Sequence, residues 1–377
     1  MHYLDNAATT RVADASADTA DAVLRAHFAN PASLYAPGAK SEAVLNAARE
    51  TVAASLGALA GEVVFTACGS EGNNLAVLGA VKARSAWASH IVVTGYEHPS
   101  VQNTVSALEK EGWNVTAVAP DAAGHIDIGA LSGAVTAKTA LVAAMHVNNE
   151  TGAVLNAAAL AKAVKEKNSR TAVHVDGVQA WGKMPVQLAA TAIDSYAVSG
   201  HKIHAPKGVG ALYLRKGYNI APVFYGGAQE KRRRPGTENV AYAAAMAKAI
   251  ELMQADKTQM QRIAALAARL WTGLAQMPGI VRNSPEDGLA ALANFSVENI
   301  KSETMLHFLE SRDVYVSSGS ACSKGEASHT LTAMGLPRAR IDTALRVSFS
   351  GENTKEDVDA LLCALREGVA AVAKIKR

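Results

Sequence analysis

The sequence predicts an α/β fold with a mainly parallel sheet, followed by a smaller α+β region. Short apolar runs of strand length recur between residues 62 and 214, and several of them alternate with helical stretches. This alternation is typical of parallel strands that are joined by helical crossovers. The chain has 377 residues, which is more than one hydrophobic core usually organises, and its pattern changes after residue 239.

The elements follow in chain order. Two alanine-rich helices are expected from about residue 14 to residue 56, with a break at 28–33 that contains Asn30-Pro31. The strands of the sheet are expected at 62–66, 91–94, 115–118, 140–145, 172–176, 195–198 and 210–214. Helices are expected after a Gly-Ser turn, from residue 73 to about 88, and after Pro99. These runs together predict a seven-stranded sheet.

The last third of the chain reads differently. A long helical stretch extends from residue 239 to about 277, with a break near Asp256. Strand-like runs then follow at 293–297, 314–317 and 344–348. Their spacing predicts a separate, smaller α+β domain.

Bulk composition excludes several classes of function. The formal net charge is only +3 and charged residues make up 19% of the chain, so neither a nucleic acid nor an anionic membrane surface is an expected partner. No basic-then-apolar leader opens the sequence, and no apolar run approaches the ~18 residues of a membrane span. The sequence therefore predicts a cytoplasmic protein. Its three cysteines form no metal-type pair, which fits a reducing compartment.

Lys202 and Asp176 form the most informative pair of residues. Lys202 follows the strand expected at 195–198, whose Ser-Gly end turns the chain, and Asp176 ends another apolar strand. A lysine that forms a Schiff base with pyridoxal phosphate (PLP) needs a carboxylate to keep the cofactor's ring nitrogen protonated. Only the pyridinium draws electrons from the substrate's α-carbon. The alternative for Lys202 is a surface charge on a loop, but its pairing with Asp176 favours the cofactor.

Other polar groups follow other expected strands. Gly69 and Ser70 could hold a phosphate at the start of a helix, or could serve only as turn and N-cap residues. His98 could lie against a flat aromatic cofactor, or cap a turn. Asn149 could donate to a substrate carboxylate, and Gln179 could bind the cofactor's phenolic oxygen. For these two residues a turn and a helix N-terminus are the alternatives.

Two residues near the end of the chain are candidates for substrate chemistry. Arg346 lies among apolar residues of an expected strand, where it is either one half of a buried ion pair or a bidentate clamp for a carboxylate. Cys322 stands in a run of small residues beside Lys324, which would favour the thiolate. Cys363, by contrast, lies in an alanine-rich helical run and is expected to be buried.

Histidines and a basic loop offer two weaker hypotheses. His201 and His204, with His174 as a third ligand, could be a metal site, but Lys202 between them would repel the ion, so no metal is expected. The loop 232–239 could bind a phosphate through Thr237, or could be a solvated run of charges.

The motifs together identify a resemblance. The sequence resembles the cysteine desulfurases of the NifS/IscS kind, which are class V aminotransferases and fold type I PLP enzymes. The similarity covers nearly the whole chain and is carried by the motifs at 4–10, 30–33, 97–98, 146–152, 174–179, 199–202, 235–239, 318–322 and 345–348. The expected large PLP-binding domain is 13–257. Residues 1–12 and 258–377 form the expected small domain, which carries the catalytic cysteine loop.

The resemblance implies a role for each candidate. Lys202 would carry PLP as a Schiff base, Asp176 would pair with the pyridine nitrogen, and His98 would stack on the ring as a catalytic residue. Gln179 would contact the phenolic oxygen. The residues implied to hold the phosphate are Gly69, Ser70, Ser199, His201 and, from the other subunit of a homodimer, Thr237.

The resemblance also implies the reaction. Asn149 and Arg346 would bind the carboxylate of L-cysteine, and Cys322 would take its sulfur as a persulfide and leave L-alanine. The sulfur would pass to an acceptor protein for iron–sulfur cluster assembly or tRNA thiolation. A selenocysteine lyase, and a non-catalytic assembly platform that retains the fold, are the alternatives. A further thiol, Cys68, is expected close to the cofactor because it adjoins Gly69.

Overall fold

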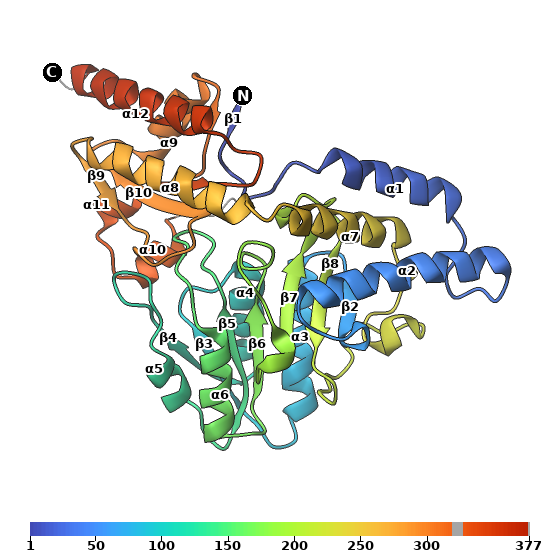
Figure 1. Cartoon of the computed structure of the whole chain (residues 1–377). Helices are drawn as coiled ribbons and strands as arrows, with labels where there is room; N and C mark the ends of the chain where they lie inside the picture. The colour runs from blue at the N-terminus through green and yellow to red at the C-terminus, as the bar shows by residue number, and fades with distance from the viewer. Residues whose placement is uncertain (319–326, 376–377) are drawn as a thin grey trace.

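The computed structural model describes residues 1–318 and 327–375 (Figure 1). Its centre is a seven-stranded sheet in the order β2-β8-β7-β6-β5-β3-β4. The strands are β2 (Val63–Thr66), β3 (His90–Thr94), β4 (Asn114–Val118), β5 (Thr139–Met145), β6 (Ala172–Asp176), β7 (Ser195–Ser199) and β8 (Gly210–Leu214). Only β8 runs antiparallel to its neighbours, β2 and β7, and the other pairs are parallel. The predicted fold class, a mainly parallel sheet of seven strands, is confirmed.

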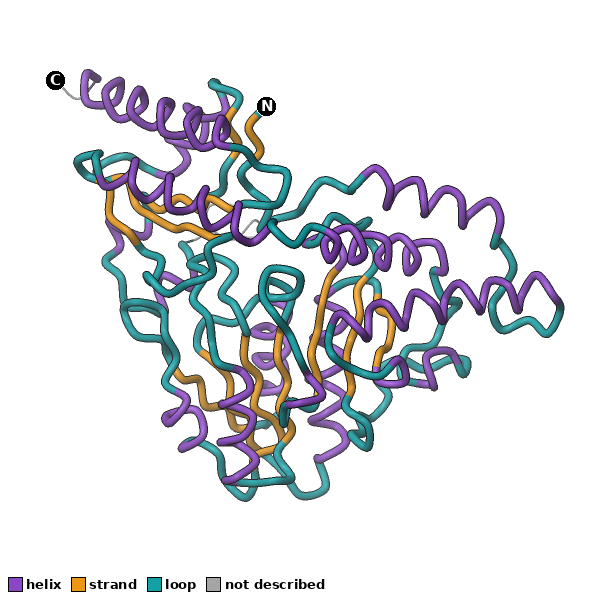
Figure 2. The backbone as a smooth tube through the Cα atoms, viewed as in Figure 1, coloured by secondary structure: helices purple, strands orange, loops and turns teal. Residues whose placement is uncertain are grey.

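Both faces of this sheet are covered by helices, which explains its apolar strands (Figure 2). Side chains alternate between the two faces: in β3, Val92 packs into one core cluster, while Ile91 and Val93 pack into the other. Helices α3 (Gly69–Arg84) and α4 (Pro99–Lys110) cover the second face. The first face is covered by α2 (Ala36–Ser55), α5 (Ile128–Gly133), α6 (Ala157–Lys167) and α7 (Val240–Ala255). Helix α1 (Asp14–Ala26) packs against α7.

Helix α3 begins earlier than the sequence predicted. A Gly-Ser turn before residue 73 was expected, but Gly69 and Ser70 already form the first helical turn, with Cys68 as the N-cap. The first N–H groups of a helix have no intrahelical partner, so glycine and serine cost little there. Glu71 also favours this start, because its carboxylate lies in the first turn and accepts a bond from Ala67 N at 2.8 Å.

A second, smaller sheet lies above the carboxyl ends of the parallel strands (Figure 1). It pairs β12 (Ala344–Ser348), β10 (Leu292–Val297) and β9 (Ile280–Arg282) in antiparallel order. Helices α8 (Gln259–Ala275), α9 (Ser302–Glu310) and α12 (Lys355–Ile375) accompany it, together with the short α10 (His329–Ala333) and α11 (Arg338–Ile341). This region has its own core, which includes Leu270, Phe295 and Leu361. The domain boundaries 13–257 and 258–377 stay a prediction.

Two details of this region differ from the expectations. The expected strand 314–317 is only β11 (Val314–Tyr315), which pairs in parallel with the N-terminal β1 (His2–Tyr3). Strand β9 was not predicted, because three residues are too few to show an alternating pattern. The break near Asp256 is confirmed, since α7 ends at Ala255 and α8 begins at Gln259.

The N-terminal segment joins the two sheets. Asp5 forms a bridge with Ser348 of β12, and five residues later the chain reaches the turn after β7, where Thr10 N donates to His201 O at 2.9 Å. Within the described ranges, 1–318 and 327–375, no helix is long and apolar enough to cross a membrane.

Candidate active site

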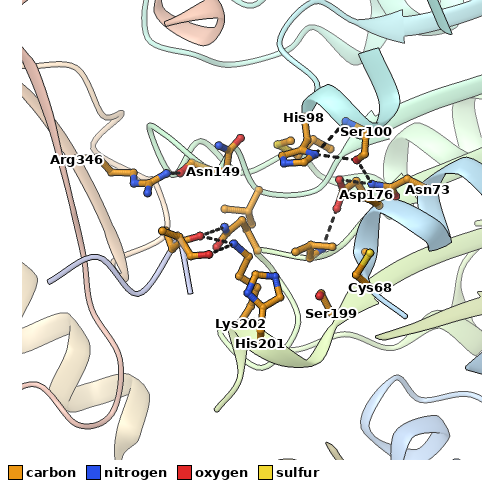
Figure 3. A pocket seen from close by; sticks show the side chains of 18 residues that line it. Cys68, Asn73, His98, Ser100, Asn149, Asp176, Ser199, His201, Lys202 and Arg346 are labelled. Atoms are coloured by element: carbon orange, nitrogen blue, oxygen red, sulfur yellow. Dashed lines mark hydrogen bonds between the residues drawn. The ribbon is translucent and has the colours of Figure 1, made fainter. Parts of the chain in front are cut away.

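A cavity of about 230 Å³ lies where the carboxyl ends of β5, β6 and β7 face the C-terminal sheet (Figure 3). Ligand sites of doubly wound sheets lie at this edge. Of the predicted site residues that the structure describes, all except Thr237 line this cavity.

Lys202 ends a short 3-10 turn, Gly200–Lys202, that follows β7 directly. Its ammonium donates to the backbone carbonyls of Ala7 at 2.6 Å and Ala8 at 2.7 Å. The N-terminal segment thus fixes the amine at the cavity wall (Figure 3). The surface-charge alternative for Lys202 is therefore wrong.

Asp176 lies at the end of β6 and is only 4% exposed. Both of its carboxylate oxygens accept hydrogen bonds: Oδ1 from Val178 N at 3.0 Å and Oδ2 from Asn73 Nδ2 at 2.8 Å. Two neutral donors orient the carboxylate, and no cation is bonded to it among the described residues. The charge of Asp176 is therefore available to a group in the cavity.

His98 is the N-cap of α4 and lines the cavity with its ring. Its Nδ1 accepts from Ser100 N at 3.1 Å and lies 2.8 Å from Ser100 Oγ. Burial lowers the pKa of His98; the charge of Lys202 adds to this effect, and the charge of Asp176 opposes it. The imidazole is therefore neutral at physiological pH, and both predicted roles, cap and cavity wall, are combined in one residue.

Positive charge gathers beside Ser199 and His201. Burial lowers the pKa of His201 to about 4, and the ammonium groups of Lys202, Lys207 and Lys183 add to the effect. Ser199 Oγ is buried and has no hydrogen-bond partner among the described residues. A Cβ at Gly69 would lie 2.5 Å from Val178 Cγ2, so only glycine fits against Val178 at this wall of the cavity. This corner of the cavity suits an anion.

Gln179 and Lys183, four residues apart in the turns that follow β6, form a hydrogen-bonded pair. Gln179 Oε1 accepts from Lys183 Nζ at 2.7 Å, and Gln179 Nε2 donates to Ala7 O at 2.9 Å. Lys183 is only 8% exposed, and burial lowers its pKa to about 7, with the charges of Lys202 and Arg346 adding to the effect. The amide of Gln179 is thus held at both ends beside the cavity.

Arg346 combines the two readings left open by the sequence. It is 1% exposed and donates from Nη2 to Asp5 at 2.7 Å and from Nη1 to Asn149 O at 3.0 Å. It is thus half of a buried ion pair, yet it also lines the cavity, and its Nε has no hydrogen-bond partner among the described residues. The side chain of Asn149 lines the cavity as well, whereas Asn148 caps its own turn by accepting from Glu150 N and Thr151 N.

Comparison with known proteins agrees with this arrangement. The family model described as aminotransferase class-V matches residues 2–361. The curated protein "Cysteine desulfurase 2" of Trichormus variabilis is 40% identical over 364 residues, which cover 96% of this chain and 91% of that protein. The chain belongs to the cysteine desulfurases of the class V aminotransferase family.

Solved structures extend the similarity to the fold. A NifS-like protein superposes with a TM-score of 0.92 at 33% identity, covering 98% of this chain and 99% of that one. The structure described as SspA in complex with cysteine superposes with a TM-score of 0.83 at 30% identity, covering 94% of this chain and 100% of that one. The fold is thus that of the NifS-like cysteine desulfurases, which are fold type I enzymes, and members of the family generally use PLP.

Three further predictions for this cysteine desulfurase concern residues that are not among those described at the cavity. Thr237 is exposed on the loop before α7 and does not line the cavity of its own chain. Cys322 lies outside the described residues. Cys363 is exposed, so the prediction that it is buried is wrong: it occupies the solvent side of α12, with Sγ 3.7 Å from Glu367.

The candidate metal ligands are used otherwise. His174 bonds Asn73 and Ser195 through its two ring nitrogens, and Nδ1 of His204 lies 2.9 Å from Arg11 O. The residues that the structure describes contain no group of three or more His, Cys, Asp or Glu side chains placed to hold a metal ion.

Sequence reasoning missed four polar residues at or behind the cavity, namely Asn73, Glu97, Ser100 and Lys183. Asn73 lies one turn after Ser70 on α3, and Ser100 lies two residues after His98 on α4, so helical spacing from a predicted residue was the available signal. Glu97 is buried behind the cavity, and burial raises its pKa to about 8. Its Oε1 accepts from Met145 N at 2.7 Å and from Thr94, and no local pattern marks that contact.

Proposed function

We propose that this chain binds PLP in the cavity through Lys202 and converts L-cysteine to L-alanine, with transfer of the sulfur to Cys322. The observation that carries the proposal is the convergence of Lys202, Asp176 and Arg346 on one cavity in a cysteine desulfurase fold. The persulfide would then pass to an acceptor protein for iron–sulfur cluster assembly or tRNA thiolation. We place the enzyme in the cytoplasm.

The residues present fit the cofactor. Asp176 offers a buried carboxylate to a protonated ring nitrogen, and the neutral ring of His98 offers a flat face. Ser199 Oγ is a buried hydroxyl without a partner among the described residues, and the N-terminus of α3 at Gly69 offers backbone N–H groups to a phosphate. Burial and, after it, the positive charges of nearby lysines lower the pKa of His201, and a phosphate would offset those charges.

The chain's own groups account for binding and proton movement. When bound, PLP supplies an electron sink for the bond changes at the substrate's α- and β-carbons. Lys202 would hold the cofactor and move protons at the α-carbon through its amine. Arg346 and Asn149 would bind the substrate carboxylate, the guanidinium by charge and the amide by donation.

Both ends of the segment that carries Cys322 adjoin the substrate residues. On one side, Ser317 and Arg346 of β12 exchange backbone hydrogen bonds of 3.1 and 2.7 Å. On the other side, Ser328 Oγ donates to Glu150 at 2.6 Å, next to Asn149. These anchors support Cys322 as the thiolate that would attack the substrate sulfur. The S–S bond of the persulfide would form as the substrate's Cβ–S bond breaks, and protonation of the carbon that loses the sulfur would leave alanine.

A Cys322→Ser variant tests this role. The variant should bind cofactor and show the spectral change that cysteine causes in the wild type, but it should form neither alanine nor persulfide, since a hydroxyl is a poor nucleophile toward sulfur. Cys363→Ser is the matched control and should match the wild type, because Cys363 lies on the solvent side of α12. Alanine release by Cys322→Ser at the wild-type rate would exclude Cys322 and point to Cys68, which lines the cavity.

We also propose a homodimer in which each site takes Thr237 from the other subunit. Thr237 is exposed, and Arg234 on its loop donates to Glu71 of α3 at 2.7 Å, which holds the loop at the phosphate end of its own chain. Mixing Lys202→Ala with Thr237→Val subunits tests the sharing, because one site of a heterodimer would then contain both intact residues. Activity that never exceeds the parents after proven subunit exchange would contradict shared sites.

A further inference from the structure

A continuous series of hydrogen bonds runs along and behind one wall of the cavity, across β7, β6, α3 and α4. Figure 3 shows its cavity side, from Asp176 through Asn73 and Ser100 to His98. The series joins Ser195 to His174 at 3.0 Å and His174 to Asn73 at 3.0 Å. From Asn73 the series divides, to Asp176 at 2.8 Å and to Ser100 at 2.9 Å. Ser100 then reaches His98 at 2.8 Å. The proposed function gives a role to Asp176 and to His98. It gives none to Asn73 and Ser100, whose hydrogen bonds connect those two residues.

The direction of each bond on the cavity side follows from the chemistry of its partners. Nδ2 of Asn73 faces the carboxylate of Asp176 and can only donate, so it also donates to Ser100 Oγ. The hydroxyl of Ser100 accepts this bond and turns its own proton to His98 Nδ1. The backbone N–H of Ser100 donates to the same ring nitrogen at 3.1 Å.

The hydrogen bonds on the other side of Asn73, toward Ser195, have directions that follow in the same way. Oδ1 of Asn73 is an acceptor, so Nε2 of His174 must carry the proton of that ring. Nδ1 of His174 then accepts from the hydroxyl of Ser195. Burial lowers the pKa of His174 to about 4, which agrees with a neutral ring that has one proton. Every donor in this series of hydrogen bonds meets an acceptor. The side-chain amide of Asn73 therefore has only one orientation that satisfies all of its partners.

Helix α4 also favours an unprotonated Nδ1 on His98. The residue caps a helix of 12 residues whose N1 position is Pro99, so Ser100 supplies the first backbone N–H that needs an acceptor. A proton on Nδ1 would remove that acceptor, and protonation of both ring nitrogens would also place a cation at the positive end of the helix. It would also set the cation beside the ammonium of Lys202 and near His201, against the single carboxylate of Asp176.

We propose that Asn73 and Ser100 are positioning residues that hold His98 as the neutral imidazole with its proton on Nε2. They do so by presenting the hydroxyl proton of Ser100 to Nδ1, and they tie this tautomer to the carboxylate of Asp176. The inference rests on the proposed function, because it concerns how His98 takes part in that reaction.

This assignment divides the work among the residues of the site. With Nδ1 engaged by two donors, His98 presents a flat ring and an Nε2–H donor to the cavity and has no free lone pair to accept a proton. Proton movement at the substrate then falls to the amine of Lys202. Asp176 and His98 are oriented by one amide, so a change at Asn73 reaches both.

Nitrogen NMR of the histidine rings tests the proposal on the purified full chain with PLP added. The ring of His98 is identified by the signals that are lost in a His98→Asn variant. In the wild type we expect the proton of His98 on Nε2 and an upfield Nδ1 signal, because accepted hydrogen bonds shift an unprotonated ring nitrogen upfield. Ser100→Ala should move this Nδ1 signal downfield, and Asn73→Ala should move it in the same direction by less.

Two further variants control for indirect effects. Ser100→Thr retains the hydroxyl and should restore the Nδ1 signal. Asn74→Ala is the matched control: Asn74 lies next to Asn73 on α3 and bonds Ser70, Ser100 O and Thr104, but neither Asp176 nor His98. The signals of His174 report whether the fold is intact, since they should change in Asn73→Ala and stay unchanged in Ser100→Ala.

The outcomes separate this proposal from the function on which it rests. A wild-type proton on Nδ1, or an Nδ1 signal that is the same in Ser100→Ala as in the wild type, overturns it. Neither result depends on turnover. If the protein makes no alanine but shows the expected NMR signals, the proposed function is contradicted and the proposed tautomer of His98 is not. If both hold, Ser100→Ala should lower kcat roughly 2–10-fold, the loss expected for one neutral hydrogen bond, with KM unchanged.

Discussion

The two sides of the cavity differ in how completely the chain pairs its own polar groups. On the Asp176 side, formed by Asn73, His98, Ser100 and Asp176, each buried contact has a donor and an acceptor within the chain. On the opposite side, buried atoms of Ser199 and Arg346 have no hydrogen-bond partner among the described residues, and positive charge accumulates.

This difference indicates which groups are already oriented and which await a ligand. An unpaired buried polar atom costs free energy, so it is retained where a ligand supplies the missing partner. The Asp176 side is built before any ligand arrives, while the opposite side gains its last bonds from one. Substitutions on the two sides should therefore fail in different ways.

The largest effect is expected for Lys202→Ala. Removing the amine removes both the covalent hold on PLP and the proton carrier at the α-carbon, so turnover should fall at least about 10³-fold. Alanine formation from cysteine is the measurement. Lys162→Ala, an exposed position on α6, should remain near the wild-type rate. Substantial sulfide release by Lys202→Ala would remove Lys202 from its role.

Asp176→Asn should disrupt the hydrogen bonds of the Asp176 side. Val178 N and Asn73 meet different oxygens of Asp176, and asparagine replaces one of these oxygens with an NH₂ group that can only donate, so one of the two bonds is lost; its neutral amide also cannot hold a pyridinium proton by charge. We expect some PLP to be retained but turnover to fall about 100-fold or more. Absorbance of the bound cofactor and the rate of alanine formation measure the two effects. Wild-type rates would show that the carboxylate charge is not needed.

Arg346→Lys should weaken the opposite side alone. Lysine keeps the charge but cannot bond Asp5, Asn149 O and a carboxylate from one planar group. KM for cysteine should rise about 10–100-fold, the range expected for one hydrogen bond to a charged group, with a smaller change in kcat. Arg269→Lys, in an exposed ion pair with Asp359, is the control. An unchanged KM would mean that Arg346 serves only its ion pair.

The smallest effect on turnover is expected for Glu97→Gln. This substitution should instead change how the free energy of unfolding depends on pH. Burial raises the pKa of Glu97 to about 8 from an ordinary value of 4.5, so between these pH values the folded chain binds a proton that the unfolded chain has lost. Glu97 therefore makes the wild type less stable as pH rises from 4.5 to 8, by at most about 1.4 kcal/mol per pH unit.

Urea unfolding at pH 5 and pH 8 measures this effect through the midpoints. The wild type should lose more stability than Glu97→Gln between the two pH values, because glutamine does not titrate. Equal losses in both proteins would show that Glu97 is ionised in the folded state.

Much of the fold and most of the site could be predicted from the sequence. The seven strands, the break near Asp256 and the position of Lys202 after β7 all carried local signals, because apolar runs and Gly or Pro punctuation are properties of neighbouring residues. The motifs supplied the rest of the site through resemblance.

What could not be predicted depends on contacts between distant segments. The start of α3 at Gly69 is favoured partly by Glu71, and β9 acquires its identity from pairing with β10. Asn73 meets Ser100 only because α3 and α4 pack side by side on one face of the sheet. Local sequence patterns contain no information about these contacts between distant segments.

The N-terminal segment has a consequence for how the chain is made. Its first residues leave the ribosome first, yet β1 pairs with β11, and Asp5 bonds Arg346 across 341 residues. At roughly 5–20 residues per second, the segment must wait on the order of tens of seconds for these partners. Its carbonyls at Ala7 and Ala8 also receive the ammonium of Lys202. The cavity therefore gains its last wall only after Arg346 has been synthesised, and a shorter nascent chain cannot yet bring Arg346 to Lys202.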